Sequence, residues 1–337
     1  MIVKIDYERA RTVFGRLLEA YTQKEYPFNQ PEATPPQVPE NLPRKLQTGT
    51  REHALFLFAL CYWMRGGIKS HTATRQLAQL YDASPSIFLP ESVSSLTSAQ
   101  LAVDFRGVGL GFNADEIADA WLDNLRKLAE KWTGDPRNLF AGITTYEEAC
   151  ERIQNRRGNG FRGFQEKMVS MLTYFFMDAG IVDRWHFPIP VDFHVLRTVF
   201  AHEIVTAEPG EANGNGFYTK PILAAVRELF RNYCVDYGVD PLRLCDAVWL
   251  YSGLACNQHP GNQSNVGGRH GRKTDLWPVA RWTSAQTRTY ERTCGACPVA
   301  ATCRWCIPSA EYYIRGRLVL REERDSPPQG NLFSISY

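Results

Sequence analysis

Long apolar segments are missing from this 337-residue sequence. The longest run, ALFLFALCYWM at 54–64, falls well short of the roughly 20 residues that cross a bilayer, so we predict a buried helix and no association with a membrane. A secretory signal is missing as well, because charged residues interrupt the first fifteen positions, MIVKIDYERARTVFG. The sequence therefore predicts a cytoplasmic protein.

The sequence also has little excess charge of one sign and little strand-like alternation of apolar and polar residues. The formal net charge is +2, so any basic surface must be local. Apolar and polar residues alternate plausibly at one place, YYIRGRLVL at 312–320, whereas apolar residues recur at helical spacing through most of the chain. We therefore predict an all-α protein. Helices are expected at 51–65, 71–81, 115–132, 145–154, 166–178, 190–204, 219–236 and 240–253.

Internal repeats and low-complexity tracts are absent, and the length suggests about two domains. Six prolines between residues 27 and 43 predict an extended segment that follows an N-terminal helix. Glycine, asparagine and proline mark loops at 205–217 and 257–273. Residues 322–337 are expected to form a weakly structured tail.

Four of the nine cysteines fall within thirteen residues near the C-terminus. In a reducing compartment, clustered thiols bind metal more often than they form disulfides. Cys294, Cys297 and Cys303 form C-x2-C-x5-C, a spacing that directs several thiolates at one inorganic centre. As fourth ligand, Cys306 would complete a compact zinc knuckle, whereas Cys256 lies upstream at the end of an expected helix. The spacing alone leaves zinc and an iron–sulfur cluster open.

Two further motifs resemble those of the helix-hairpin-helix DNA glycosylases, in the branch of endonuclease III and adenine glycosylase. FRGFQEKMV at 161–169 resembles the hairpin L-P-G-V-G-x-K-x-A, and VDFHVLRTV at 191–199 resembles V-D-T-H-V-x-R-V, which follows the hairpin in that family. Upstream, residues 58–81 resemble the substrate-facing loop between two helices, and residues 105–125 resemble the segment I-x-x-x-G-L-Y-N-x-K-A-x-x-I. The motifs follow the family order over most of the chain.

The cysteines resemble the cluster loop of the same family, G-R-x-x-C-x6-C-x2-C-P-x4-C. The segments SGLAC and TCGACPVAATC supply its parts, but 37 residues replace the usual six in the first gap. The resemblance implies a [4Fe–4S] cluster, with zinc as the alternative and Cys306 as a spare thiol that the long gap keeps open as fourth ligand. The implied cluster ligands are Cys256, Cys294, Cys297 and Cys303.

The resemblance assigns base excision to Lys167 and Asp192. Cutting an N-glycosidic bond develops positive charge on the sugar, which a carboxylate can stabilise. Asp192 follows FPIP, where prolines predict the start of a helix whose dipole keeps a carboxylate ionised. Lys167 would attack the sugar C1′ and form a Schiff base; alternatively, Asp192 directs a water and Lys167 contacts a phosphate. His194 is expected at the base pocket or as a structural residue of that helix, and Arg197 as a brace of the fold.

Other predicted DNA contacts lie in two glycine-containing loops. Gly163 lets the hairpin amides approach a phosphate, although Gln165 stands where the family has its second glycine. The stretch MRGGIK is expected to carry the base pocket, with Arg65 and Lys69 meeting phosphates or the orphan base; its glycines could equally be a helix break.

Residues 257–293 form an insertion with six Lys or Arg against two acidic residues, interleaved with Trp277, Trp282 and Tyr290. Basic groups with aromatic platforms suit unpaired nucleic acid or a flipped base. A solvated loop that covers the cluster is the equal alternative.

The resemblance implies a two-lobed all-α fold, with a six-helix barrel at 65–185 facing a cluster lobe of 1–64 and 186–321, and DNA between them. The expected function is that of a monomeric DNA glycosylase that flips a damaged or modified base out of double-stranded DNA and excises it, with associated AP-lyase activity. In a bacterium the protein would associate with the nucleoid. The alternatives are an N-glycosylase of modified nucleosides or nucleotides, and a non-catalytic DNA-binding module with a structural cluster. The sequence names neither the base nor a role in repair rather than in defence against modified foreign DNA.

Overall fold

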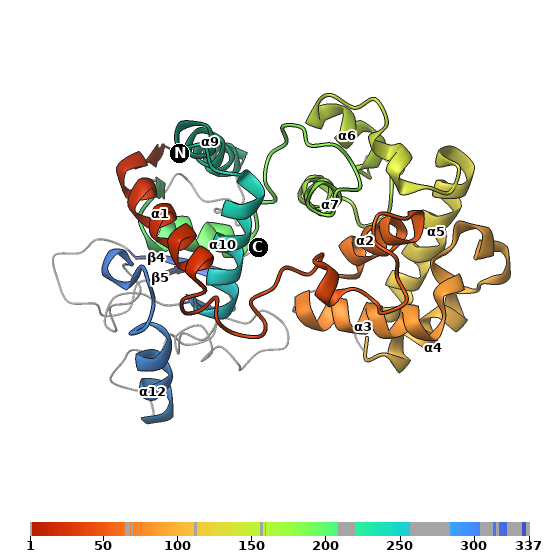
Figure 1. Cartoon of the computed structure of the whole chain (residues 1–337), viewed down its shortest axis with the longest axis horizontal. Coiled ribbons are helices and arrows are strands. Elements are labelled where there is room, and N and C mark those ends of the chain that lie inside the picture. The colour runs from red at the N-terminus through yellow and green to blue at the C-terminus, as the bar shows by residue number, and fades with distance from the viewer. Residues whose placement is uncertain are drawn as a thin grey trace. The chain divides into compact units, whose positions relative to one another are not determined.

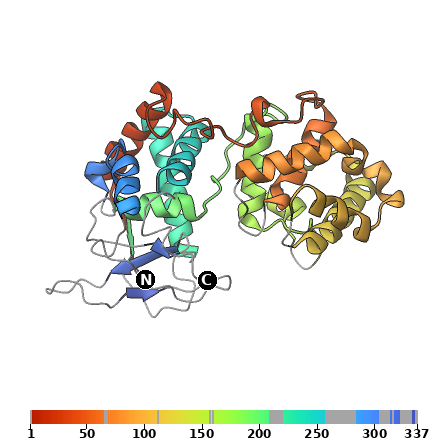
Figure 2. The same ribbon diagram turned by 90° about the horizontal axis from the view of Figure 1, so that it is seen from below.

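The structure is a computed structural model, and most of its described residues are helical, which confirms the all-α class (Figure 1). Its strands are short. β1 (Val3–Ile5) pairs antiparallel with β2 (Val205–Ala207), and β4 (Arg317–Arg321) pairs with both β3 (Tyr313–Ile314) and β5 (Leu332–Ser334). The second sheet begins where alternation predicted a strand and is drawn in blue in Figure 2. The structure describes residues 2–64, 68, 70–110, 113–155, 158, 160–207, 220–256, 284–303, 313–314, 317–321 and 332–334.

The chain forms two compact units. Unit 1 contains residues 1–33 and 191–337, and unit 2 contains residues 34–190. The expected lobes placed residues 34–64 with the cysteines, whereas contacts in the structure group this segment with unit 2.

Unit 1 is built around contacts of α10 with α1, α8 and α9. β1 precedes α1 and pairs with β2 in the register Val3↔Ala207, which ties the N-terminus to the segment that follows α8. Phe14 of α1 packs against Phe230 and Tyr233 of α9, with ring centroids 5.0 and 5.2 Å apart. The helices of unit 1 are α1 (Tyr7–Gln23), α8 (Phe193–Ala201), α9 (Lys220–Tyr237), α10 (Pro241–Leu254) and α12 (Ser284–Thr293), with the 3-10 turn η8 (Ala300–Thr302).

Unit 2 surrounds α2, which contacts α3, α5 and α7 (Figure 1). Every residue from 53 to 63 is buried, which confirms the predicted buried helix and explains its apolar character on all faces. The helices of unit 2 are α2 (Arg51–Trp63), α3 (Ser70–Ala83), α4 (Ser98–Gly107), α5 (Ala114–Trp132), α6 (Tyr146–Ile153) and α7 (Glu166–Asp178). Its 3-10 turns are η1 (Pro39–Asn41), η2 (Pro85–Phe88), η3 (Pro90–Ser95) and η4 (Pro136–Phe140).

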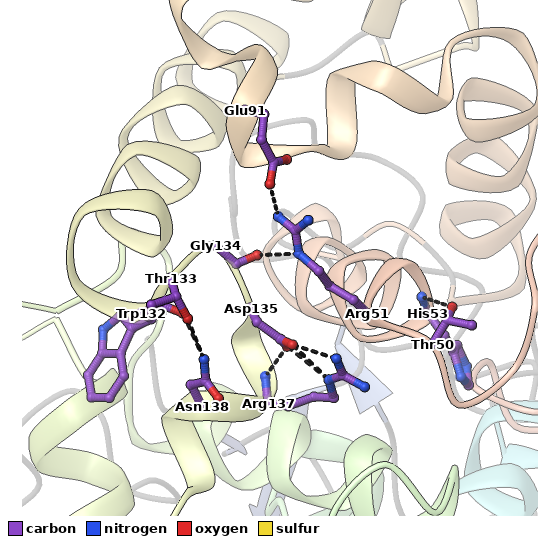
Figure 3. Close-up of polar contacts among 10 residues, drawn as sticks. All are labelled: Thr50, Arg51, His53, Glu91, Trp132, Thr133, Gly134, Asp135, Arg137 and Asn138. Atoms are coloured by element: carbon purple, nitrogen blue, oxygen red, sulfur yellow. Dashed lines mark hydrogen bonds and ion pairs between the residues drawn. The ribbon is translucent and has the colours of Figure 1, made fainter.

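Polar contacts fix the N-terminus of α2 against the turn between α5 and η4 (Figure 3). Arg51 donates to the carbonyl of Gly134 at 2.9 Å and pairs with Glu91. Gly134 has φ +70°, a conformation that favours glycine, and a Cβ there would lie 2.7 Å from the Arg51 guanidinium and make that side chain shift. Asp135 caps η4 and holds Arg137 through both carboxylate oxygens.

Most expected helices appear within a few residues of their predicted bounds. The helix expected at 190–204 is shorter, because the chain stays extended past Pro190 and Asp192 caps α8. Helices α4 and α12 were not predicted. Both are ten residues long; α4 shows little apolar periodicity, and α12 contains few apolar residues. Among the described helices, none has the length and apolar character needed to cross a membrane.

Candidate functional site

A hairpin joins α6 to α7 in unit 2. The amide of Asn155 donates to Phe164 O at 2.8 Å, and the amide of Phe161 donates to Ile153 O at 3.1 Å. Gly163 lies at the turn with φ +90°, a conformation that favours glycine. The segment is thus a helix–hairpin–helix, as the motif at 161–169 predicted.

Two side chains of α5 brace this hairpin through hydrogen bonds to its backbone. Asn124 is fully buried; its Oδ1 accepts from the amide of Arg162 at 2.7 Å, and its Nδ2 donates to Arg162 O at 3.0 Å. Lys127 donates to the carbonyls of Gly160 at 2.8 Å and Gly158 at 3.3 Å. Sequence reasoning missed both residues, because polar side chains three apart on an amphipathic helix are normally solvated.

Lys167 lies in the first turn of α7, directly after this hairpin. Gln165 caps the helix in an extended conformation without a side-chain capping hydrogen bond. Burial raises the pKa of the Cys61 thiol in α2, and the positive charge of Lys167 opposes this shift, so the two side chains are near each other. The half-buried Lys167 therefore borders the apolar core around α2.

Asp192 is the N-cap of α8 in unit 1, as the preceding prolines predicted. Its Oδ1 accepts from the amides of His194 at 2.8 Å and Val195 at 3.2 Å, and the residue is 6% exposed. Two amide donors and the helix dipole favour the charged carboxylate. This arrangement holds one carboxylate oxygen in a fixed position.

His194 and Arg197 are buried and connect α8 to Ser252 of α10. His194 Nδ1 lies 3.3 Å from Ser252 Oγ, and the Arg197 guanidinium donates to Ser252 O at 3.2 Å. The His194 ring also packs edge-on against Trp249, with centroids 5.7 Å apart. These contacts give both residues a structural role, and a contact of His194 with a base stays a prediction.

The four cysteines implied as cluster ligands are buried in unit 1, and none forms a disulfide. Burial raises the pKa of Cys256 far above its usual range; the Arg197 charge opposes this shift, and Cys303 and Cys297 add to it, so these groups are neighbours. Cys294, Cys297 and Cys256 all raise the pKa of the half-buried Tyr26. Within the described residues, however, no three Cys, His, Asp or Glu side chains are close enough to share one metal ion.

A hydrogen-bonded network borders the cysteines. Tyr251 of α10 has its hydroxyl 3.5 Å from Cys297 Sγ and 3.2 Å from His202 Nε2. The other ring nitrogen of His202 lies 3.0 Å from Thr302 Oγ1, next to Cys303. Burial lowers the pKa of His202 to about 3, so the ring is neutral at physiological pH. No sequence pattern predicted this network, since its members are spread over a hundred residues.

Several predicted site residues lie outside the described residues. They are Arg65, Lys69, Cys306 and most of the 257–293 insertion. Of that insertion the structure describes 284–293, where Arg288 is exposed in α12. Lys167 and Asp192 belong to different units, and each is placed here by its own surroundings.

No family model and no curated protein matches this sequence. Solved structures do show similarity, at low identity and over most of the chain. One is a thermostable thymine-DNA glycosylase, with TM-score 0.48 and 11% identity over 89% of this chain and 97% of the other. Another is a non-covalent endonuclease III–DNA complex, with TM-score 0.47 and 14% identity over 89% and 96% of the two chains. A trapped endonuclease III–DNA covalent intermediate has TM-score 0.43 and 13% identity over 83% and 93%.

Proposed function

We propose that this protein is a DNA glycosylase that excises a damaged or modified base. The observation that carries the proposal is the placement of two motif residues. Lys167 lies in the first turn of the helix that follows a braced hairpin, and Asp192 caps the helix that follows an extended, proline-containing segment. Each lies at the N-terminus of a helix, where a phosphate or a developing charge can be met.

Asp192 would act on the charge that develops at the sugar. As the glycosidic bond breaks, the deoxyribose ring becomes positive and the departing base takes the electron pair. A carboxylate held by two backbone amides needs no reorganisation to stabilise that ring. Removing such a stabilising group costs about 10² to 10³ in rate.

Lys167 is proposed as the nucleophile. Its deprotonated amine would form a bond to C1′ as the bond to the base breaks, and the base would leave with a proton. The C1′–O4′ bond would then break and O4′ would take a proton, which opens the sugar ring and gives the Schiff base. Loss of a proton from C2′ would break the C3′–O bond, and this step nicks the strand. In the alternative, a water directed by Asp192 attacks C1′ and the strand stays intact.

The hairpin is proposed to hold the DNA backbone. Amides at a tight turn and at a following helix N-terminus bind a phosphate without reading sequence. The bracing by Asn124 and Lys127 supports this role, because it fixes the hairpin backbone although Gln165 replaces the usual second glycine. Arg65, Lys69 and His194 remain proposed contacts to the phosphate or the base.

The buried cysteines are proposed to hold an iron–sulfur cluster, as the cluster-loop motif implies, with zinc as the alternative. In a [4Fe–4S] cluster each cysteine binds a different iron. The influence of these thiols on one another and on Tyr26 supports one common ligand set. We propose Cys256, Cys294, Cys297 and Cys303 as the ligands of a cluster that cross-links unit 1 and takes no part in bond cleavage.

The test is base release from duplex DNA that carries a panel of damaged and modified bases. Asp192→Asn should keep DNA binding and lose base release by about 10² or more. Asp240→Asn is the matched control, because Asp240 is also the N-cap of a helix in unit 1 and accepts from Leu242 N at 3.0 Å. Equal base release by both variants would contradict the proposed role.

Binding of unmodified duplex at several salt concentrations separates the alternatives. A duplex enzyme should lose affinity with a log–log slope of about −0.9 for each phosphate it neutralises. A nucleoside N-glycosylase would release bases from free nucleosides and show no such binding. A non-catalytic module would bind DNA and release no base from any substrate.

A further inference from the structure

The hydroxyl of Tyr26 is buried next to the cysteines and has no hydrogen-bond partner within the described part of the chain. Proteins rarely leave a buried polar group in this state, because it loses its bonds to water on folding. Such a group therefore points to a missing partner.

The surroundings of Tyr26 indicate which partner is missing. Electrostatic coupling identifies Cys297, Cys294 and Cys256 as neighbours of the phenol. A phenol carries an O–H group that donates a hydrogen bond. A neutral thiol is a weak acceptor, whereas thiolates bound to iron and inorganic sulfides carry negative charge and accept hydrogen bonds.

The chain around Tyr26 is firmly placed. Lys24 closes α1 in a left-handed conformation, Glu25 pairs with Arg16, and Phe28 packs edge-on against Tyr21 with centroids 5.2 Å apart. Helix α1 itself packs on α10, which ends just before Cys256. The phenol is thus held beside the thiols by contacts on both sides of it in the sequence.

We propose that the Tyr26 hydroxyl donates a hydrogen bond to a sulfur of the iron–sulfur cluster held by Cys256, Cys294, Cys297 and Cys303, and that this bond raises the cluster's reduction potential. The inference rests on the proposed cofactor. Tyr251 is a second phenol at the same site, but it already contacts Cys297 and His202. Tyr26 is therefore the residue whose only role toward the cluster would be this bond.

The direction of the effect follows from charge. Reduction adds an electron to the cluster, and a hydrogen bond to one of its sulfurs stabilises the more negative state. Loss of the bond should lower the reduction potential and make the cluster easier to oxidise and to lose. The phenyl ring of a Tyr26→Phe variant keeps the packing and removes the donor alone.

The test compares the purified full-length protein with Tyr26→Phe and with Tyr7→Phe. Tyr7 lies in α1 of the same unit, and its hydroxyl accepts from Asn232 at the surface. Iron and sulfide content, the reduction potential by film voltammetry, and the exchangeable-proton coupling of the paramagnetic cluster in H₂O and D₂O are measured for each. Tyr26→Phe should keep the cluster, lower its potential, lose one exchangeable proton coupling and shed iron several-fold faster in air. Tyr7→Phe should match the unsubstituted protein.

The outcomes separate the inference from the proposed cofactor. Unsubstituted protein without iron would overturn the cofactor itself and, with it, the role of Tyr26. A loaded Tyr26→Phe variant with unchanged potential and proton coupling would overturn the inference alone. If Tyr26→Phe does not fold, a fluorinated tyrosine at position 26 decides: its more acidic hydroxyl should raise the potential, and an unchanged potential would refute the bond.

Discussion

The Asn124 side chain forms two hydrogen bonds with the backbone of Arg162. It accepts from the amide at 2.7 Å and donates to the carbonyl at 3.0 Å. The side chain is fully buried, and it links α5 to the hairpin that leads into α7. The hairpin is thereby positioned by a residue that sequence comparison of the hairpin alone would not include.

Asn124→Ala should therefore loosen the hairpin. We expect a loss of about 1–3 kcal/mol in the free energy of unfolding, since two buried backbone groups lose their partner, together with weaker binding to duplex DNA. Asn138→Ala is the control, because Asn138 also braces a turn of unit 2, at Trp132 O and Thr133 Oγ1. It should lower stability and leave DNA affinity unchanged. Equal DNA affinity for both variants would remove the hairpin from the proposed DNA interface.

Lys167 as nucleophile makes a covalent prediction. Borohydride added during turnover should reduce the Schiff base and trap a protein–DNA adduct, and the product strand should be nicked. Lys167→Gln should lose both, whereas Lys131→Gln, at an exposed position of α5, should retain them. Base release without trapping or nicking would assign the attack to a water. Trapping that persists in Lys167→Gln would place the amine elsewhere, and Lys69 would be tested next.

The cysteine assignment predicts a brown protein that absorbs broadly near 400 nm and carries about four irons. Cys256→Ser should remove the colour, and Cys306→Ser should not. Cys245→Ser is the control, because Cys245 is another buried thiol of α10. Stoichiometric zinc without iron, or loss of colour in Cys306→Ser with retention in Cys256→Ser, would refute the ligand set.

His53 predicts acid sensitivity of unit 2. Its Nδ1 accepts from the amide of Gly49 at 3.0 Å, and the residue is 2% exposed. Figure 3 shows His53 beside Thr50, the N-cap of α2. Burial lowers the pKa of His53 to about 4, below the 6.5 of an unfolded chain. The stability this neutral ring contributes is fully present above about pH 6.5 and is lost as the pH falls toward 4, because only the unfolded state then takes up the proton.

The loss amounts to about 3 kcal/mol between these two pH values. This loss is measured by urea unfolding at pH 7 and pH 4, with hydrogen exchange of the α2 amides as the signal from unit 2. His53→Gln should flatten this dependence, whereas the exposed His186→Gln should not. An unchanged pH dependence in His53→Gln would exclude His53 as its source.

The sequence by itself determined the helices and the motifs that they carry. Apolar spacing, capping residues and prolines act over a few residues, so the buried α2 and the position of Asp192 near a helix N-terminus could be predicted without tertiary contacts. The helix was nevertheless expected to begin at residue 190, whereas α8 begins at Phe193. The same local rules missed α4, whose apolar periodicity is weak, and α12, which contains few apolar residues. The expected division of the chain also differs from the two units, because the grouping of residues 34–64 depends on packing rather than on local pattern.

Only the tertiary structure decided what surrounds those motifs. It brings Tyr26 from the N-terminus to Cys294 and Cys297, and it places Asn124 behind a hairpin that begins some thirty residues later. Neither pair of residues could be recognised from a periodicity or a spacing in the sequence, because each depends on how whole helices pack against one another. The side chains of the proposed site could be recognised from motifs in the sequence. The residues that position those side chains are identified only by contacts in the folded chain.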